Sequence, residues 1–463
     1  FVLNYIGPIL FFWGFTKIFI RGSLKFQGFV AKLVKFAGDL NVLSTKNVRR
    51  NPARTAAAAF LIAMITGYGF QVTGTYASEQ DYIIRQIRFY VGAEISVRLS
   101  TLQNLSSTMD KISNISEVSS ITVEYTFYGQ TANGETSMKL LAVDPEEWLN
   151  IAYYEGDLFK GRDVTSAFQE MRSDNNTIIL DRVIAERLKL SVGDSISIKF
   201  KGQSDTKVYN LRVVGFFGPE RAQVTGYRRI YPSYYWSYVP EGFFNSVRDE
   251  LYSSYGRILV KLVAGADGEA VAEKIRKLDL SDVSAVYSVA EILEQWQESP
   301  LSLSQTFFLS FIGATEIQRL GVIFAFLAAS IGTALVTLVS LKERSKEIGI
   351  MSVRGLSFRQ IVNVLLTDNL AVVGFAVFLG AVVGLVVVQG NISLANSMPT
   401  PVLTPSPVPA FSFSPILRRM VFPLDSILTL TACCTLIFAS TIIPILLAVK
   451  RYLLEIERIV REV

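Results

Sequence analysis

Residues 342–361 read KERSKEIGIMSVRGLSFRQI, and this charged stretch lies directly between two long apolar runs. The run before it, residues 320–341, is LGVIFAFLAASIGTALVTLVSL, and the run after it, residues 370–390, is LAVVGFAVFLGAVVGLVVVQG. A membrane-spanning helix needs about 20 mostly apolar residues, and both runs reach that length. We therefore expect the charged stretch to connect two spans at a membrane surface.

The order of residues within this connection predicts a short helix, a sharp stop and a new helix. Gly355 is suited to end the first helix in the left-handed conformation. Ser357 and Gln360, three residues apart, form the pattern of a capping box at the start of the next helix. Such a connection is stiff and carries charges of both signs, which suits a surface on which another protein pushes.

Three further runs are long and apolar enough to span a membrane. The mean hydropathy of the whole chain is +0.36, and only 18% of its residues are charged, against roughly 25% in a typical soluble domain. Five such runs with charged flanks disfavour the alternative of buried helices in a large soluble protein. The fold class that we predict is a membrane α-helical protein with about five transmembrane helices, the other three at residues 2–20, 55–76 and 427–449.

The positive charges predict the orientation of these spans. Basic clusters follow the first run, precede the second, lie between the third and fourth, and follow the fifth. Because alternating spans put all four clusters on one side, the positive-inside rule makes that side cytoplasmic. Arg418 and Arg419 are the exception, since the same topology places them outside. The net charge of +5 is thus a membrane-surface feature, and we expect lipid rather than nucleic acid as a partner.

A large extracytoplasmic α+β domain is inserted between the second and third spans. Its residues 77–319 are numerous enough for a core of their own. Alternating runs predict strands at 94–100, 119–129 and 136–143, and later segments mix further strands with short helices. The predicted organisation is 1–45 linker helix and cytoplasmic connector, 46–76 transmembrane helix, 77–319 outer domain, 320–341 transmembrane helix, 342–360 coupling helix, 361–390 transmembrane helix, 391–424 proline-rich outer loop, and 425–463 transmembrane helix with a cytoplasmic tail.

No catalytic or metal-binding residue is predicted. The chain contains no histidine, which excludes histidine-based catalysis and histidine-ligated metal sites. Its two cysteines, Cys433 and Cys434, are adjacent in the last apolar run, where packing is a simpler interpretation than a disulfide or a metal site. No Gly-rich phosphate loop of the form G-x-x-x-x-G-K-[ST] occurs, so any ATP has to be bound by another chain.

An aromatic segment in the outer domain, residues 227–244, has two interpretations. It could be a surface that binds a lipid, a peptide or a partner protein. It could instead be a strand whose aromatic side chains cover the sheet, and this second interpretation is favoured because aromatic residues are common in strands. The candidate binding residues are Tyr231, Tyr234, Tyr235, Trp236 and Tyr238.

Four Asn-x-Ser/Thr triplets fall on the predicted outer side. They are candidate glycosylation sites, provided that the organism has the machinery, but chance is the favoured explanation because the outer side holds most of the polar sequence. The asparagines are Asn104, Asn114, Asn175 and Asn391.

The connection at 342–361 also resembles a known family. FtsX-like permeases of the MacB and LolC type carry approximately E-R-x-x-E-I-G-[IL]-[LM]-R-A-[LI]-G-x-[ST]-x-x-Q-I after the corresponding helix. Ser352 departs from this pattern, since the family usually has Arg there, and Arg354 stands where the family has an aliphatic residue. The residues that fit are Glu343, Arg344, Glu347, Ile348, Gly349, Ile350, Met351, Gly355, Ser357, Gln360 and Ile361.

The resemblance extends over nearly residues 40 to 450. NVRRNPARTA at 47–56 is similar to a family motif before the second span, and LLAVDPEEWL at 140–149 is similar to the family's outer domain. Gly380 and Gly384 form a G-x-x-x-G pattern that predicts close helix packing. Asp368 stands where the family often has Glu, and we interpret it as an acid at a helix N-terminus.

The resemblance implies the permease subunit of an ABC transporter, with ATP and Mg²⁺ bound by cytoplasmic ATPase subunits. It also implies a second permease half or a homodimer partner, and this chain would be the C-terminal half of a double-length member. The implied mechanism is mechanical transmission to an outer domain that acts on lipid-linked, lipoprotein or peptide-like substrates. The alternative is a membrane-anchored regulator or structural surface protein without a functioning ATPase. The residues implied in ATPase coupling are Glu343, Arg344, Glu347, Gly349, Arg354, Gly355, Ser357 and Gln360.

Overall fold

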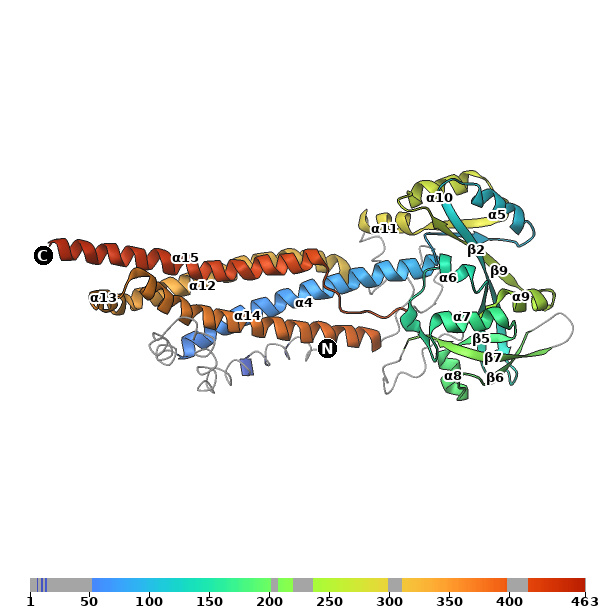
Figure 1. Ribbon diagram of the computed structural model, residues 1–463, viewed down its shortest axis with the longest axis horizontal. Coiled ribbons are helices and arrows are strands. Elements are labelled where there is room, and N and C mark those ends of the chain that lie inside the picture. The colour runs from blue at the N-terminus through green and yellow to red at the C-terminus, as the bar shows by residue number, and fades with distance from the viewer. Residues whose placement is uncertain are drawn as a thin grey trace. The chain divides into compact units, whose positions relative to one another are not determined.

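A computed structural model describes residues 6, 10, 13–14, 52–200, 207–219, 236–298, 310–397 and 415–462 of the 463-residue chain (Figure 1). The chain divides into two units. The helical unit comprises Phe1–Glu79, Thr306–Ser393 and Met420–Val463, and the outer domain comprises Gln80–Gln305 and Leu394–Arg419. Most of the predicted span at 2–20 and the connector to residue 45 lie outside the described residues.

From residue 52 onward, the described part of the helical unit contains four long helices and one short helix, and the first long helix, α4, continues into the outer domain. Three of the long helices contain stretches that are long and apolar enough to cross a membrane, at Gly321–Glu343, Val372–Asn396 and Leu424–Tyr452, with mean hydropathies of 2.4 to 2.5. The predicted span at 55–76 is helical, but it is not one of these three candidate spans. The helices are α4 (Pro52–Val91), α12 (Ser310–Glu343), α13 (Ser345–Val353), α14 (Phe358–Ser397) and α15 (Leu424–Glu462).

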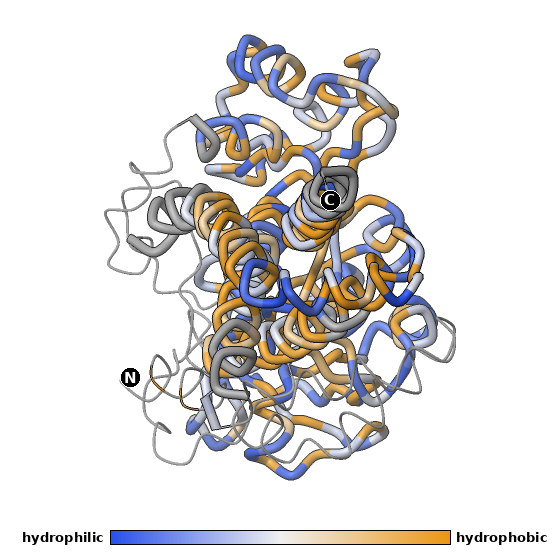
Figure 2. Tube along the Cα trace, turned by 90° about the vertical axis from the view of Figure 1, so that its left-hand side faces the viewer, coloured by the Kyte–Doolittle hydropathy of each residue, from blue (hydrophilic) through white to orange (hydrophobic). Residues whose placement is uncertain are grey.

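The long helices pack on one another through apolar side chains. One cluster joins the first part of α4 to α12, α14 and α15, and its fully buried members include Ala63, Ala376 and Ile437. Phe326 of α12 is 1% exposed, so this aromatic ring lies in the middle of the packing. Figure 2 shows hydrophobic residues along these helices and a mixture of hydrophilic and hydrophobic residues in the outer domain.

Ten strands of the outer domain form one mixed sheet. Its order is β10-β1-β9-β2-β3-β8-β5-β7-β4, and β6 pairs with β2 and β7. The pairs β3–β8 and β5–β7 are parallel, whereas the other pairs are antiparallel. The strands are β1 (Ile95–Leu99), β2 (Val118–Thr131), β3 (Ser137–Val143), β4 (Phe159–Lys160), β5 (Thr177–Asp181), β6 (Ser195–Lys199), β7 (Val208–Phe217), β8 (Trp236–Pro240), β9 (Ser254–Leu262) and β10 (Val283–Ser288).

Helices of the outer domain supply part of the core beside this sheet. Ile112, Ile184, Phe244 and Val271 come from four different helices and belong to the same buried cluster as the strand residues. The amphipathic spacing of the segment at Gly268–Lys277, with Val271, Ala272 and Ile275 buried, explains why it forms a helix on the sheet. The helices are α5 (Leu105–Ser113), α6 (Glu147–Ile151), α7 (Val164–Ser173), α8 (Arg182–Leu188), α9 (Glu241–Val247), α10 (Gly268–Lys277) and α11 (Val289–Glu298), with the 3₁₀ turns η2 (Gly156–Leu158) and η3 (Arg248–Glu250).

Several predicted boundaries are wrong because helices continue past the apolar runs. The helix α4 ends at Val91 rather than at residue 76, and α14 ends at Ser397 rather than at residue 390. Apolar length locates a span, whereas backbone hydrogen bonds carry the helix on beyond it. Asp368 consequently lies eleven residues into α14, which begins at Phe358, so its interpretation as a helix N-terminal acid is wrong.

Candidate functional site

The connection between α12 and α14 contains the short helix α13, and its end has the predicted geometry. Gly355 has φ +85°, in the left-handed region, immediately after the last helical residues. Its amide donates to the carbonyl of Ser352 (2.9 Å), and the amide of Leu356 donates to the carbonyl of Met351 (3.1 Å). These two bonds form a Schellman motif, which satisfies carbonyls that the helix end would leave without donors.

The next helix, α14, begins with the predicted capping box. The amide of Ser357 donates to Oε1 of Gln360 (2.8 Å), and the amide of Gln360 donates to Oγ of Ser357 (3.4 Å). Two amides at the start of the helix are thereby satisfied reciprocally. Only Leu356 therefore separates the left-handed Gly355 from the cap, and the angle between α13 and α14 is defined by hydrogen bonds rather than by a loose loop.

Apolar packing holds α13 against the neighbouring helices. Ile348 of α13 has no exposed surface, and Met351 and Leu356 pack partly buried against the same cluster. The contacting residues come from the end of α12, the start of α14 and the C-terminal part of α15. The buried members are Leu341, Ile348, Ile361, Val362, Leu365, Ile445 and Val449. We call residues 344–360, which comprise α13, its C-terminal stop and the capping box of α14, the coupling unit. The cluster described above is the packing that holds it.

The opposite side of α13 presents apolar groups. Ile350 is 55% exposed and Val353 is 79% exposed, although each is a residue type that usually lies inside a protein. Phe358, at the start of α14, is 40% exposed. A helix places residues three apart on one face, so Ile350 and Val353 are neighbours. Their spacing can be read from the sequence, but the sequence does not show which face of the helix is exposed.

The predicted coupling residues surround these apolar groups. Glu343 is the last residue of α12, and Arg344 precedes α13 as its N-cap. Glu347 lies in the first turn of α13, where a negative charge is favoured by the helix dipole. Arg354 is the exposed C-cap residue, and Gly349 lies half-buried within the helix. The connection therefore brings all eight predicted residues into one short stretch.

The two glycines of the G-x-x-x-G pattern lie where α14 meets α4. A Cβ atom on Gly380 would lie 2.5 Å from the carbonyl oxygen of Ala63, and one on Gly384 would lie 2.6 Å from the carbonyl oxygen of Gly67. Only glycine permits such a close approach of one backbone to another. The predicted packing role of both residues is therefore confirmed.

Comparison with known families adds to this geometry. The model described as MacB-like periplasmic core domain matches residues 55–278, and the model described as FtsX-like permease C-terminal matches residues 319–453. The chain belongs to the FtsX-like permease family. The permease is thus a multi-pass membrane component of the ABC-transporter class, with its large domain outside the cytoplasm. With that domain outside, a connection that follows one candidate span further along the chain is expected on the cytoplasmic side, and this placement of the coupling unit stays a prediction.

Two solved structures each match a part of this chain. The periplasmic region of MacB from Actinobacillus actinomycetemcomitans is 15% identical, with 44% of this chain and 91% of that chain covered and a TM-score of 0.28. The extracellular domain of the noncanonic ABC-type transporter YknZ from Gram-positive bacteria is 13% identical, with 42% and 98% covered and a TM-score of 0.28. The comparison with curated proteins gave no match. The family assignment rests on the two family models.

The aromatic segment of the permease is part of the sheet where the structure describes it. Tyr238 on β8 is 3% exposed, and its ring lies 5.1 Å from that of Phe217, centroid to centroid. Trp236 is half-buried and stacks on Phe89 at 5.2 Å. The prediction of an outer binding surface is therefore wrong for Tyr238, whose ring belongs to the core. Tyr231, Tyr234 and Tyr235 lie outside the described residues.

The four sequon asparagines lie in different surroundings. Asn114 is exposed at the end of α5, and Asn175 is exposed before β5. The side-chain amide of Asn104 donates to Oδ1 of Asp282 (3.0 Å), so the nitrogen that a glycan needs already has a partner. Asn391 was expected in an outer loop, but it is a helical residue within the candidate span Val372–Asn396, so its placement in a loop is wrong.

Proposed function

We propose that this permease transmits ATP-driven motion from cytoplasmic ABC ATPase subunits to its outer domain, where the change of shape acts on a lipid-linked, lipoprotein or peptide-like substrate. ATP and Mg²⁺ are bound by the partner ATPase. The permease works with a second permease half or with a second copy of itself. In this proposal the ATPase acts on the coupling unit, and the sheet of the outer domain is the part that changes shape.

The single observation that carries the proposal is the exposed apolar face of α13. Ile350 and Val353 leave apolar area open to water at a surface that is otherwise rich in charge. The buried centre of a protein–protein interface is more apolar than its surroundings and poor in charged residues, whereas its rim is polar. Arg354, also exposed, is suited to that rim. A cytoplasmic protein that covers this face removes the apolar area from water.

The construction of the coupling unit supports transmission rather than simple anchoring. The Schellman motif and the capping box join α13 to α14 without a loose residue between them. Ile348 has no exposed surface and packs against α14 and α15. A push on α13 therefore displaces both helices instead of being absorbed by a flexible loop, because close-packed interiors transmit strain.

Close helix packing supplies the next step of the proposed path. Gly380 and Gly384 hold α14 against the backbone of α4 at Ala63 and Gly67. The helix α4 then continues without interruption to Val91, directly before the first strand of the outer domain. We infer that displacement of α14 is passed to α4 and along it, as a two-state rearrangement that the nucleotide biases.

The test is purification of the permease in detergent from its own membrane, with mass spectrometry of the proteins that remain bound. We expect a stoichiometric subunit that contains a Walker ATPase motif. Val353→Asp should remove this subunit, because it places a charge in the centre of the interface, and so should Glu347→Lys and Gly355→Pro. Val263→Asp is the matched control, since Val263 is 49% exposed on the outer domain. Purification of the intact permease without any ATPase refutes the proposal.

A further inference from the structure

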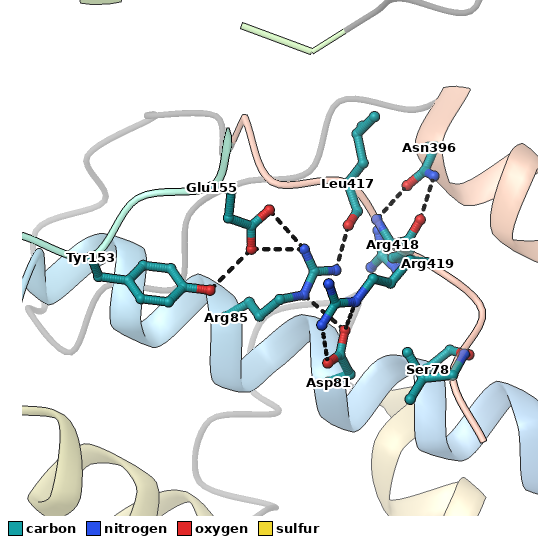
Figure 3. A network of polar contacts seen from close by, with 10 residues as sticks. Ser78, Asp81, Arg85, Tyr153, Glu155, Asn396, Leu417, Arg418 and Arg419 are labelled. Atoms are coloured by element: carbon teal, nitrogen blue, oxygen red, sulfur yellow. Dashed lines mark hydrogen bonds and ion pairs between the residues drawn. The ribbon is translucent and has the colours of Figure 1, made fainter. Parts of the chain in front are cut away.

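A cluster of ionic side chains, from the buried Arg85 to the exposed Arg419, ties three distant segments of the outer domain together (Figure 3). The first segment is the C-terminal part of α4, with Asp81 and Arg85. The second is the loop before η2, with Tyr153 and Glu155. The third is residues 415–419, which precede α15 in the chain and which we call the return segment. All three belong to the same unit, so their contacts are internal to the outer domain.

Arg85 is at the centre of this cluster and contacts all three segments. Its side chain is only 7% exposed. Its Nε donates to Oδ2 of Asp81 (2.8 Å), and its Nη1 donates to both carboxylate oxygens of Glu155 (2.9 Å each). Its Nη2 donates to the carbonyl oxygen of Leu417 (2.6 Å). The planar guanidinium is suited to this role because its five N–H groups point in fixed directions, which a lysine cannot reproduce.

Asp81 and Arg419 form a second, bidentate contact between α4 and the return segment. Nε and Nη2 of Arg419 each donate to one carboxylate oxygen of Asp81 at 3.0 Å. Burial on its own would raise the pKa of Asp81, but hydrogen bonds from Arg419 and Arg85, together with their charges, hold that pKa below its ordinary value. The carboxylate therefore stays ionised and accepts from both arginines at once.

The remaining residues of the return segment are held as well. The amide of Arg418 donates to Oδ1 of Asn396, and Nδ2 of Asn396 donates back to the carbonyl of Arg418, both at 2.9 Å. The guanidinium of Arg418 lies 4.0 Å from the centroid of the Tyr82 ring, in a cation–π contact. Ile416 is 3% exposed. The segment is therefore bound along its length by main-chain, ionic and apolar contacts.

These contacts explain the exception to the charge rule. Arg418 and Arg419 are placed on the outer side, where the positive-inside rule does not expect basic residues. Arg419 balances Asp81, and Arg85 balances Glu155, so the charges of the two pairs cancel. Arg419 pairs with Asp81 and Arg418 lies on the Tyr82 ring, so both basic side chains are held on α4 within the outer domain.

We propose that Arg85 is a positioning residue for the coupling movement: it locks the return segment, and hence the chain that leads into α15, to α4 and to the Tyr153–Glu155 loop, so that the three segments move as one body. Only the role of the lock in transmitting movement rests on the proposed function. The lock itself is a property of this chain and is testable without any ATPase.

With the lock, movement can reach the outer domain through two chain connections, α4 and the return segment, instead of through α4 alone. The chain enters this cluster through α4 and leaves it through the return segment, only five residues before α15 begins at Leu424. Without the lock, the return segment is a tether that follows the domain passively. With it, displacement at the start of α15 reaches Arg85 and then Glu155, which lies directly before η2 and β4.

The first experiment uses hydrogen–deuterium exchange of the full chain in lipid nanodiscs. Arg85→Met removes four hydrogen bonds and leaves two carboxylates without their shared partner. We expect exchange in peptides that cover 415–421 and 153–158 to rise at least tenfold, while the central strands β2 and β9 stay protected. Arg172→Met is the matched control, because Arg172 forms its ion pair with Glu146 at a surface where both side chains are more than half exposed; no change is expected there.

A second variant covers the case in which Arg85→Met unfolds the domain. Asp81→Asn keeps the size of the side chain but removes the charge that accepts from Arg85 and Arg419, and it should open the 415–421 peptide while leaving 153–158 nearly protected. This split pattern is not expected from general destabilisation, which would raise exchange in both peptides and in β2. Exchange at 415–421 that changes less than twofold in Asp81→Asn overturns the lock.

The second experiment uses the complex with whichever ATPase co-purifies. With wild-type permease, we expect ATP to change exchange in the 153–158 peptide. With Asp81→Asn, the ATPase should still co-purify and hydrolyse ATP, but the ATP-dependent change should fall at least fivefold. An undiminished change refutes the positioning role of the cluster. If no ATPase co-purifies with wild-type permease, the proposed function fails, whereas the first experiment still decides whether the lock exists.

Discussion

Substitution of Gly355 tests whether the sharp stop after α13 holds the coupling unit in place. The residue has φ +85°, and a Cβ atom added to it would meet nothing within 4 Å, so no steric clash accompanies the change. An L-residue in the left-handed α region costs roughly 1–2 kcal/mol. Alanine also lowers the conformational entropy of the unfolded chain, which offsets about 0.4–1 kcal/mol of this destabilisation. The net destabilisation of the α13 terminus by Gly355→Ala is therefore about 1 kcal/mol, or roughly fivefold in the opening equilibrium.

Hydrogen exchange of the Leu356 amide measures this opening, because that amide donates to the carbonyl of Met351 across the stop. We expect about fivefold faster exchange in Gly355→Ala and a smaller increase in Gly355→Asn, since asparagine tolerates the left-handed region better. Gly374 is a matched control: it lies in α14 without a positive φ and with nothing within 4 Å. Gly374→Ala should leave exchange unchanged or slow it locally, because alanine is the better helix former. Equal protection of Leu356 in the wild type and Gly355→Ala refutes the reasoning.

Three further predictions concern packing and charge. Gly384→Ala forces a Cβ against the carbonyl oxygen of Gly67, and we expect a lower thermal midpoint for the detergent-solubilised chain because overpacking costs about 1–3 kcal/mol, whereas Gly374→Ala should not lower it. Burial and the charge of Arg257 lower the pKa of Lys139 to about 8, so above this pH the unfolded chain holds more protons than the folded one. Stability should therefore rise with pH between about 8 and 10, and Lys139→Met should abolish this rise in thermal midpoints. Tyr238→Ala removes a fully packed ring, and a loss of about 3–5 kcal/mol should expose the β3 and β8 amides to exchange.

Each of these predictions has an outcome that contradicts it. Equal midpoints for Gly384→Ala and Gly374→Ala would mean that α14 does not approach α4 closely at Gly67. A pH profile of Lys139→Met that parallels the wild type would assign the rise to another group. Unchanged exchange of β3 and β8 in Tyr238→Ala would return this tyrosine to the surface and revive its role as a binding residue.

The parts of the coupling unit that follow from local rules were predictable from the sequence. A glycine after a short helix and a Ser-x-x-Gln pattern depend on the backbone within a few residues, and Gly355, Ser357 and Gln360 have the predicted conformation and hydrogen bonds. The strands at 94–100, 119–129 and 136–143 are likewise confirmed as β1, β2 and β3 with shifts of one or two residues. Alternation of apolar and polar residues is itself a local signal.

The features that depend on distant segments were not predictable in this way. Tyr238 is buried because β8 pairs with β3, almost a hundred residues earlier in the chain, and the aromatic composition of the segment does not reveal that partner. The exposure of Ile350 and Val353 depends on which face of α13 packs against α15 through Ile348. Asp368 is a different case: it was interpreted as lying at a helix start because it precedes the apolar run, although the capping box at Ser357 already placed the start of that helix before it, at Phe358.

The pair Arg418 and Arg419 shows how an exception to a general rule carries structural information. The positive-inside rule describes basic residues that face water or lipid headgroups, and it makes no statement about those that form ion pairs within a domain. Two adjacent arginines on the outer side therefore indicate acidic or aromatic partners elsewhere in the chain, and Asp81 and Tyr82 are those partners. The sequence indicated that a contact exists, but it did not indicate which residues are the partners. Asp81 accepts from Arg419 of the return segment and from Arg85, and Arg85 in turn donates to Glu155. Because these contacts share Asp81 and Arg85, the return segment, α4 and the Tyr153–Glu155 loop are held together as one body.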